Sequence, residues 1–166
     1  LLGSRGLGDV YKRQSLFMCH VASSVLLQGR NVLYITLEMA EEKIAERIDA
    51  NLLNIPIQKL SDLPKSMFQK KIASLGKKTQ GKLIIKEYPT ASAHVGHFKS
   101  LIGDLALKRS IKPDIIFIDY LNICASQRYK GSIVNSYTYV KAIAEELRGL
   151  AVEANVPIVS ATQTTR

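Results

Sequence analysis

The segment PDIIFIDYL, residues 113–121, decides the fold class. It opens with Pro113 and Asp114, continues through a run of bulky apolar residues and then reaches a second acid, Asp119. A continuous apolar run is typical of a strand that is buried on both faces of a sheet. An acid at the end of such a strand costs free energy unless it has a partner or a task. The segment therefore predicts a buried strand with a functional carboxylate at its carboxyl end.

The rest of the chain alternates apolar runs with amphipathic stretches. Further strands are predicted at residues 31–37, 82–88 and 156–163. Helices are predicted from apolar residues at helical spacing at 15–28, 40–54, 61–78, 93–109 and 139–154. Strands that are joined by long helices cannot pair as hairpins, and they form a parallel sheet with helices on both faces. We therefore expect an α/β fold in a single domain.

Composition limits the function classes. The chain has 166 residues, of which 46% are hydrophobic, so it can bury a core. No apolar run approaches the roughly 18 residues that a membrane span requires. Cys19 and Cys124 lie in apolar stretches without metal-ligand spacing, which favours reduced thiols in a cytosolic protein. The net charge of +9 suits a polyanionic partner. We expect a soluble, cytoplasmic protein with no membrane partner.

Polar side chains follow three of the predicted strands. Glu38 comes after VLYITL, Asp119 after IIFI and Gln163 after IVSAT. Ligands of open α/β sheets bind beyond the carboxyl ends of the strands, so these residues are candidates for one site. Asp119 could hold Mg²⁺ through water, Glu38 could deprotonate an attacking water, and Gln163 could sense a terminal phosphate. Glu38 could instead cap the following helix, and Gln163 alone carries no information.

Three segments resemble one known family. They are NVLYITLEMAEEKIAERIDANLL (31–53), PDIIFIDYLNICAS (113–126) and NSYTYVKAIAEELRGLAVEANVPIVSATQTTR (135–166). They are similar to the RecA-like motor domain of DnaB-type replicative DNA helicases, and most similar to the helicases of large tailed phages. The resemblance covers residues 15–166, and it implies a RecA-like P-loop NTPase core that is one part of a longer helicase.

The resemblance also implies roles for individual residues. It makes Glu38 the catalytic glutamate, Asp119 the Walker B aspartate on Mg²⁺, and Gln163 the sensor glutamine. Arg166 falls on the arginine of the same motif and is assigned to the nucleotide. Arg128 and Lys130, in the polar loop after the Walker B strand, are candidates for nucleic-acid contact, although a plain solvated loop explains them equally well.

Cofactors and partners follow from the same family. The implied cofactors are ATP and Mg²⁺. The implied partners are single-stranded DNA, five further copies in a homo-hexamer, and a replicative primase. A phage-encoded protein of this kind would work in the cytoplasm of the host cell.

The amino-terminal segment departs from the family. The phosphate-loop pattern G-x-x-x-x-G-K-[ST], aligned on Ser15, finds Gly8 at its first glycine. It finds Arg13 at the second glycine and Gln14 at the lysine, whereas Ser15 matches the magnesium-binding hydroxyl. We expect residues 1–14 to be a non-native segment that resembles translated sequencing adaptor, and residues 15–166 to be a partial ATPase domain. A naturally degenerate loop is the alternative.

Two other functions fit parts of the pattern. The first is a RecA-type recombinase or another ATPase of the same fold. The second is a non-hydrolysing binding or assembly module, which the loop with Arg13 and Gln14 favours and the acids Glu38 and Asp119 oppose. The chain as written is expected to be inactive in ATP hydrolysis, because the glycine and lysine of the loop are absent.

Overall fold

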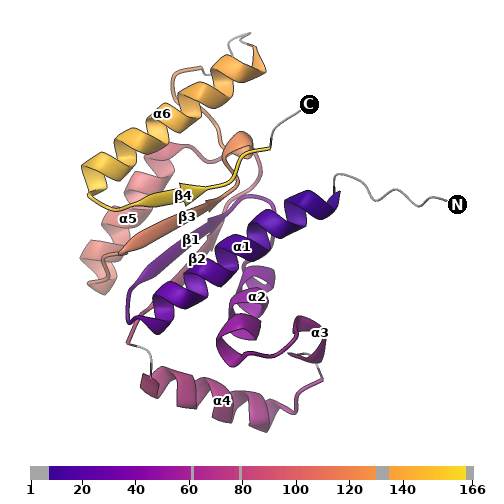
Figure 1. Ribbon diagram of the computed structural model, residues 1–166. Coiled ribbons are helices and arrows are strands. Elements are labelled where there is room, and N and C mark those ends of the chain that lie inside the picture. The colour runs from indigo at the N-terminus through magenta and orange to yellow at the C-terminus, as the bar shows by residue number, and fades with distance from the viewer. Residues whose placement is uncertain (1–7, 61, 79, 130–134, 164–166) are drawn as a thin grey trace, which may run out of the picture.

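A parallel four-stranded sheet forms the centre of the computed structural model, which describes residues 8–60, 62–78, 80–129 and 135–163 (Figure 1). The strands are β1 (Val32–Thr36), β2 (Leu83–Glu87), β3 (Ile115–Asp119) and β4 (Ile158–Ser160). Their order is β2-β1-β3-β4, and every neighbouring pair is parallel. The predicted parallel α/β sheet is therefore confirmed.

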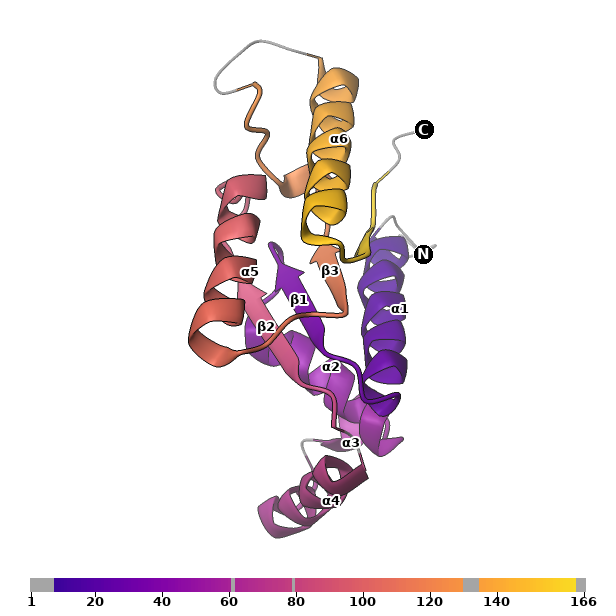
Figure 2. The same cartoon turned by 90° about the vertical axis from the view of Figure 1, so that its left-hand side faces the viewer.

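Helices cover both faces of this sheet, as predicted. One face carries α1 (Gly8–Leu27) and α2 (Glu41–Leu53), and the other carries α5 (Val95–Arg109) and α6 (Ser136–Ala154) (Figure 2). The helices α3 (Ile57–Leu60) and α4 (Lys65–Lys78) lie beyond α2, away from the sheet. Among the described residues, no helix combines the length and apolar character that a bilayer span needs.

Strand residues alternate between two cores. Val32, Tyr34 and Phe117 pack against α1 and α2, where Met18, Ala22 and other buried side chains meet them. The neighbouring residues of the same strands point to the other face, against α5 and α6; they are Leu33, Ile35, Ile116 and Ile118. Successive side chains of a strand point to opposite faces, so an unbroken apolar run is buried on both. This double burial explains why the central strands contain almost no polar residue.

Several element ends differ from the prediction. The first helix begins at Gly8, not at Ser15. The helix predicted from residue 61 begins at Lys65, because a residue before proline is disfavoured in the helical region and Pro64 therefore marks the start. Residue 61 itself lies outside the described residues. The last strand ends at Ser160, because the next residues bind the 3-10 helix η1 (Leu121–Ile123) instead of extending the sheet.

The helix predicted from Tyr139 begins earlier because of an amino-terminal cap. The side-chain oxygen of Asn135 accepts a hydrogen bond of 2.7 Å from the backbone N–H of Thr138, which makes Ser136 the first helical residue. Asn135→Ala should lower the free energy of unfolding by about 1 kcal/mol, since a capping oxygen is lost. Urea denaturation followed by circular dichroism measures this change. Ser136→Ala is the matched control and should change it little; equal effects of both substitutions would contradict the cap.

Candidate functional site

The topology places a switch point at the carboxyl edge of the sheet. The chain leaves β1 for β2 on one side and then crosses to β3 on the other, so the strand order reverses between β1 and β3. Open α/β sheets bind ligands at such a switch point, beyond the carboxyl ends of the strands. Thr36 of β1 is paired with Asp119 of β3, and Glu38 follows just after β1. Two of the predicted site residues therefore flank the switch point.

Asp119 ends β3 and is almost wholly buried, with 2% of its surface exposed. Its Oδ2 accepts a hydrogen bond of 3.0 Å from the hydroxyl of Tyr34. The other oxygen, Oδ1, makes no hydrogen bond with any residue in the described part of the chain. Mg²⁺ in nucleotide sites is bound through one or two carboxylates and water. A carboxylate with one oxygen fixed and the other without a protein partner fits that task.

Glu38 lies in the turn between β1 and α2, and its side chain is exposed. The turn is shaped by Thr36, whose Oγ1 accepts a hydrogen bond from the Met39 N–H at 3.0 Å and donates one to the Met39 carbonyl at 2.8 Å. Helix α2 begins at Glu41 with Ala40 at the cap position, and the Glu41 N–H donates a hydrogen bond of 3.2 Å to the side chain of Glu87 on β2, not to Glu38. The alternative that Glu38 caps this helix is therefore wrong.

Gln163 lies at the same edge of the sheet as Asp119. Strand β4 pairs with β3, and the segment after β4 is held by Asn122 of η1. The Asn122 side chain accepts hydrogen bonds from Gln163 N at 3.1 Å and Thr162 Oγ1 at 2.9 Å, and it donates one to the Gln163 carbonyl at 3.2 Å. The sequence analysis missed Asn122, although its place three residues after the end of β3 was a signal.

The amino-terminal part of α1 reaches this edge too. The Gln14 side chain donates a hydrogen bond of 3.1 Å to the Thr162 carbonyl, next to Gln163. Ser15 follows and is buried, with 5% exposed. The position that the loop pattern gives to the lysine therefore lies at the edge where the strand-end residues gather.

The backbone of this segment differs from a phosphate loop, however. Residues from Gly8 onward are helical, so Arg13, Gln14 and Ser15 lie beyond the first turn of α1. Backbone N–H groups beyond the first turn donate to carbonyls four residues earlier, so they do not turn toward a ligand. A phosphate loop works by the opposite arrangement, in which such groups surround the phosphates.

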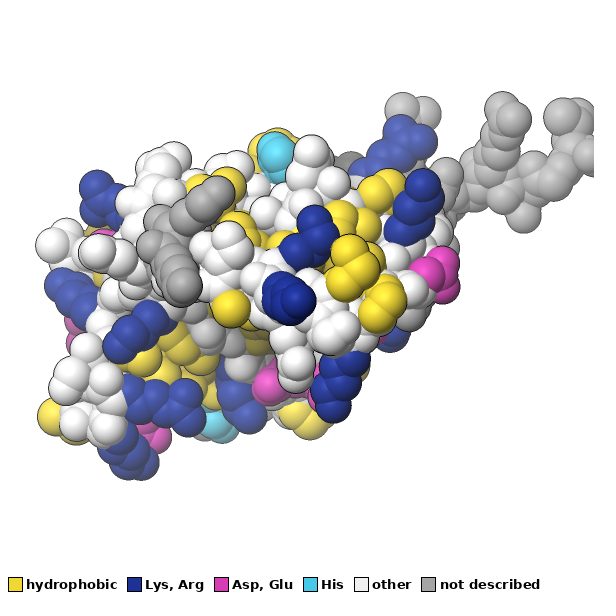
Figure 3. Space-filling view, turned by 90° about the horizontal axis from the view of Figure 1, so that it is seen from below, with side chains coloured by type: hydrophobic (Ala, Val, Ile, Leu, Met, Phe, Trp, Pro, Cys, Tyr) yellow, Lys and Arg dark blue, Asp and Glu magenta, His cyan; other side chains and the backbone are white. Residues whose placement is uncertain are grey.

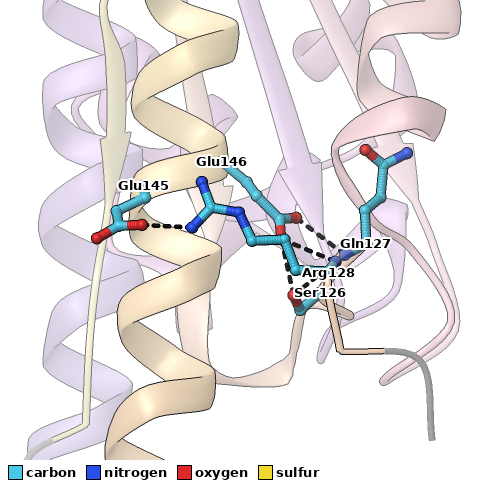
Figure 4. Close-up of polar contacts among 5 residues, drawn as sticks. All are labelled: Ser126, Gln127, Arg128, Glu145 and Glu146. Atoms are coloured by element: carbon cyan, nitrogen blue, oxygen red, sulfur yellow. Dashed lines mark hydrogen bonds and ion pairs between the residues drawn. The ribbon is translucent and has the colours of Figure 1, made fainter. Parts of the chain in front are cut away.

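The structure describes only one of the two basic residues that were candidates for nucleic-acid contact. Lys130 lies outside the described residues, as does Arg166, which the resemblance assigned to the nucleotide. Arg128 is described, and its guanidinium is paired with Glu145 of α6 (Figure 4). The hydrogen bond to Glu145 raises the pKa of Arg128, and the same bond lowers the pKa of Glu145. Arg128 therefore stays charged, but a phosphate would compete with Glu145 for it.

The first residues of the loop after η1 are hydrogen-bonded to a second acid of α6, Glu146, which the sequence analysis missed. Glu146 accepts hydrogen bonds from Ser126 Oγ at 2.7 Å, Gln127 N at 3.0 Å and Arg128 N at 3.3 Å (Figure 4). Ser126 is buried, and its N–H also donates to the Tyr139 hydroxyl at 3.0 Å. These bonds fix where the loop leaves the domain. In the sequence, the only indication of this contact was the pair of adjacent acids, Glu145 and Glu146, within the predicted helix.

Other basic side chains form no single patch on the face that Figure 3 shows, which is seen from below relative to Figure 1. Lys and Arg side chains are spread over this face and are separated by hydrophobic and acidic ones (Figure 3). Lys65, Lys70 and Lys71 of α4 are exposed. These lysines therefore lie on a solvated helix face, and this view singles out no surface for a polyanion.

Comparison with known proteins agrees with the geometry. The model of the DnaB-like helicase C-terminal domain matches residues 12–166. The chain is 46% identical over 153 residues to the DnaB-like replicative helicase of Enterobacteria phage T4, covering 90% of this chain and 32% of that protein. It is 32% identical over 141 residues to a probable plasmid replicative DNA helicase of Chlamydia muridarum, covering 84% of this chain and 30% of that protein. It thus spans about a third of these relatives.

Solved structures share the fold. A DnaB-like replicative helicase, solved with a study of its interactions with primase, superposes with a TM-score of 0.69 over 92% of this chain and 36% of that chain. A second solved structure, of an ATPase domain, superposes with a TM-score of 0.70, again over 92% of this chain and over 53% of that chain. Both are 20% identical to it in sequence. The predicted RecA-like core is confirmed by these likenesses.

Proposed function

Because the chain belongs to the DnaB-like helicase C-terminal domain family, we propose that it is part of the motor of a replicative DNA helicase. The motor would couple ATP hydrolysis to translocation on single-stranded DNA and to duplex unwinding. The observation that carries this proposal is the carboxyl edge of the sheet. There Asp119 ends β3, while Glu38 and Gln163 come after β1 and β4, so that these residues lie on both sides of the switch point.

The residues at this edge suit ATP with Mg²⁺. Asp119 Oδ1 and the Ser15 hydroxyl would hold the ion, directly or through water, and neither makes a hydrogen bond within the described residues. The ion would neutralise charge on the β- and γ-phosphates. Gln163 is held at its backbone by Asn122, which leaves its side-chain amide for the terminal phosphate. Arg166 would serve the nucleotide by family analogy.

Glu38 would act as the general base. Its side chain is exposed at the switch point and is not used to cap α2. It would orient a water in line with the terminal phosphate and accept its proton as the water attacks. The bond to the leaving diphosphate then breaks, and the Gln163 amide would respond to the loss of the phosphate. Positioning and electrostatics supply most of the catalysis in such reactions.

DNA and protein partners are proposed on the family alone. A homo-hexameric ring would carry single-stranded DNA in its channel, and a primase would bind the assembled helicase. Lys130 remains a candidate for phosphate contact. Arg128 would reach a phosphate only by leaving Glu145, so we give it the smaller share of DNA affinity.

The chain as written should hydrolyse ATP negligibly. Arg13 and Gln14 replace the glycine and lysine of the phosphate loop, and the segment is helical. A neutral amide cannot supply the charge that the lysine gives to the phosphates. Steady-state release of phosphate, measured with single-stranded DNA and Mg²⁺ present, tests this expectation. Turnover near one per second, which is within the ordinary range for enzymes, would contradict it.

A non-hydrolysing binding module is the second candidate. The helical course of residues 8–14 favours it, because it offers phosphate no ring of backbone N–H groups. The strand-end acids count against it, since a buried carboxylate such as Asp119 is costly to keep without use. The recombinase alternative is disfavoured, because the family model and the curated relatives described above are replicative helicases.

A further inference from the structure

A row of buried polar side chains connects α1 to the end of β3. Cys19 of α1 and Tyr34 of β1 have no exposed surface, and Asp119 has 2%. The Cys19 Sγ lies 3.8 Å from the Tyr34 hydroxyl oxygen, which in turn lies 3.0 Å from Asp119 Oδ2. Tyr34 thus stands between a helix that carries Ser15 and a strand that carries Asp119.

The chemistry of the groups sets the direction of these hydrogen bonds. An ionised carboxylate can only accept, so the single phenolic proton of Tyr34 is donated to Asp119. The oxygen of Tyr34 is then left to accept the weak S–H donor of Cys19. Chains of hydrogen bonds that run in one direction polarise and strengthen each other in a buried setting.

The ring of Tyr34 is also fixed in place. It stacks on Phe117 with 5.7 Å between the ring centroids and an interplanar angle of 18°. Phe117 precedes Asp119 by two positions on β3, so it lies on the same face of the sheet. A ring held on one side by this stack and at its oxygen by Cys19 has little freedom to turn. The donor that meets Asp119 is thus rigid.

The two oxygens of Asp119 differ in their contacts. Oδ2 is taken by Tyr34, whereas Oδ1 has no partner among the described residues. A free carboxylate could turn about its terminal bond and offer either oxygen. The hydroxyl of Tyr34 removes that freedom. Ser15 lies one helical turn before Cys19, on the same face of α1. The row from Cys19 to Asp119 therefore links the helix face that carries Ser15 to the carboxylate, and these are the two groups assigned to Mg²⁺.

We propose that Tyr34 is a positioning residue for Mg²⁺, which holds the Asp119 carboxylate so that Oδ1 faces the nucleotide. This inference rests on the proposed function, because it assumes that Asp119 serves the ion. Tyr34 itself touches neither nucleotide nor water in this role. Groups that orient a metal-binding residue from behind are typically worth 10- to 100-fold in metal affinity or activity.

The test measures the Mg²⁺ requirement of nucleotide binding, not turnover. The full chain with Arg13→Gly and Gln14→Lys is titrated with a fluorescent ATP analogue at rising Mg²⁺ concentrations and in EDTA. Tyr34→Phe in that background should raise the Mg²⁺ concentration at half-maximal binding by about 10- to 100-fold. Affinity in EDTA should stay unchanged, since a missing hydroxyl behind Asp119 does not touch the phosphates.

Three controls separate positioning from structure. Asp119→Asn should cause a comparable shift, and adding Tyr34→Phe to it should cause no further shift. Cys19→Ala leaves the bond from Tyr34 to Asp119 intact and should cause a small shift only. Tyr139→Phe removes a hydroxyl that accepts from Ser126 N, away from the strand-end residues, and should cause none.

The possible results distinguish failure of the proposed site from failure of the role of Tyr34. Nucleotide binding that ignores Mg²⁺ before Tyr34 is changed overturns the proposed site and this inference with it. An unshifted Mg²⁺ requirement in Tyr34→Phe, or equal weakening with Mg²⁺ and in EDTA, overturns the inference alone. If Tyr34→Phe does not fold, the double variant Tyr34→Phe with Asp119→Asn is examined, because it contains no buried carboxylate that has lost its hydrogen-bond donor. Recovery of folding in that combination supports the inference, and a second failure assigns Tyr34 to packing.

Discussion

Glu38→Gln is expected to lower the rate of ATP hydrolysis by about 100- to 10,000-fold, the usual worth of a general base. The background for this substitution is a full-length helicase that contains this domain, with Arg13→Gly and Gln14→Lys in place. The change keeps the shape of the side chain and removes the group that accepts a proton. ATP affinity should change little, because the exposed carboxylate of Glu38 is proposed to face water and not the phosphates. Phosphate release and equilibrium binding of nucleotide measure the two effects separately.

Glu42→Gln is the matched control for this experiment. Glu42 is an exposed acid in the first turn of α2, close to Glu38 in the chain. It should retain most of the activity, because loss of one negative charge near the site is not in itself harmful. If Glu38→Gln were as active as Glu42→Gln, Glu38 would not be the base. The role of base would then pass to another acid.

Arg13→Gly together with Gln14→Lys should raise the affinity for ATP with Mg²⁺ by roughly 10- to 100-fold, as hydrogen bonds to charged groups contribute about 1.5–3 kcal/mol. The lysine adds a charge for the β- and γ-phosphates. The glycine disfavours the helix by about 1 kcal/mol, which helps residues 8–14 of α1 to open and turn their N–H groups toward phosphate. The Gln14 side chain already contacts the Thr162 carbonyl, so a lysine at this position would start at the correct edge.

Binding of a fluorescent ATP analogue measures this gain, and circular dichroism follows the loss of helix. Arg13→Gly with Gln14→Met is the control, since methionine resembles lysine in length but carries no charge. It should reproduce the loss of helix without the gain in affinity. Equal affinity of the two double variants would show that charge at position 14 is irrelevant. That result would favour the non-hydrolysing module.

The sequence determined the class of fold because the deciding signals are local. The apolar runs around Ile116 and Leu33 show burial on both faces, and long amphipathic stretches between runs force parallel pairing. The same signals place Glu38 and Asp119 directly after strands, which is where ligands of such sheets bind. None of these inferences requires knowledge of which strands are neighbours. They were accordingly predictable, and the fold and parallel pairing are confirmed.

Element ends were harder to predict, because weak local preferences compete there. Residues 8–14 lack any clear pattern, yet they continue α1 once Ser15 and Cys19 are packed against the sheet. The last predicted strand stops at Ser160 because Asn122 binds the residues that follow it. In both cases a tertiary contact decided between conformations of similar free energy.

Only the tertiary structure decided which side chains meet across the sheet. Periodicity shows that Tyr34 and Asp119 are buried, but their contact depends on β1 lying next to β3, although β2 comes between them in the sequence. The same holds for Asn122 with Gln163 and for Glu146 with Ser126. Hydrogen bonds between nitrogen and oxygen atoms require donor and acceptor roughly 3 Å apart, and such distances are fixed by strand order and helix packing, which a pattern along the chain does not encode.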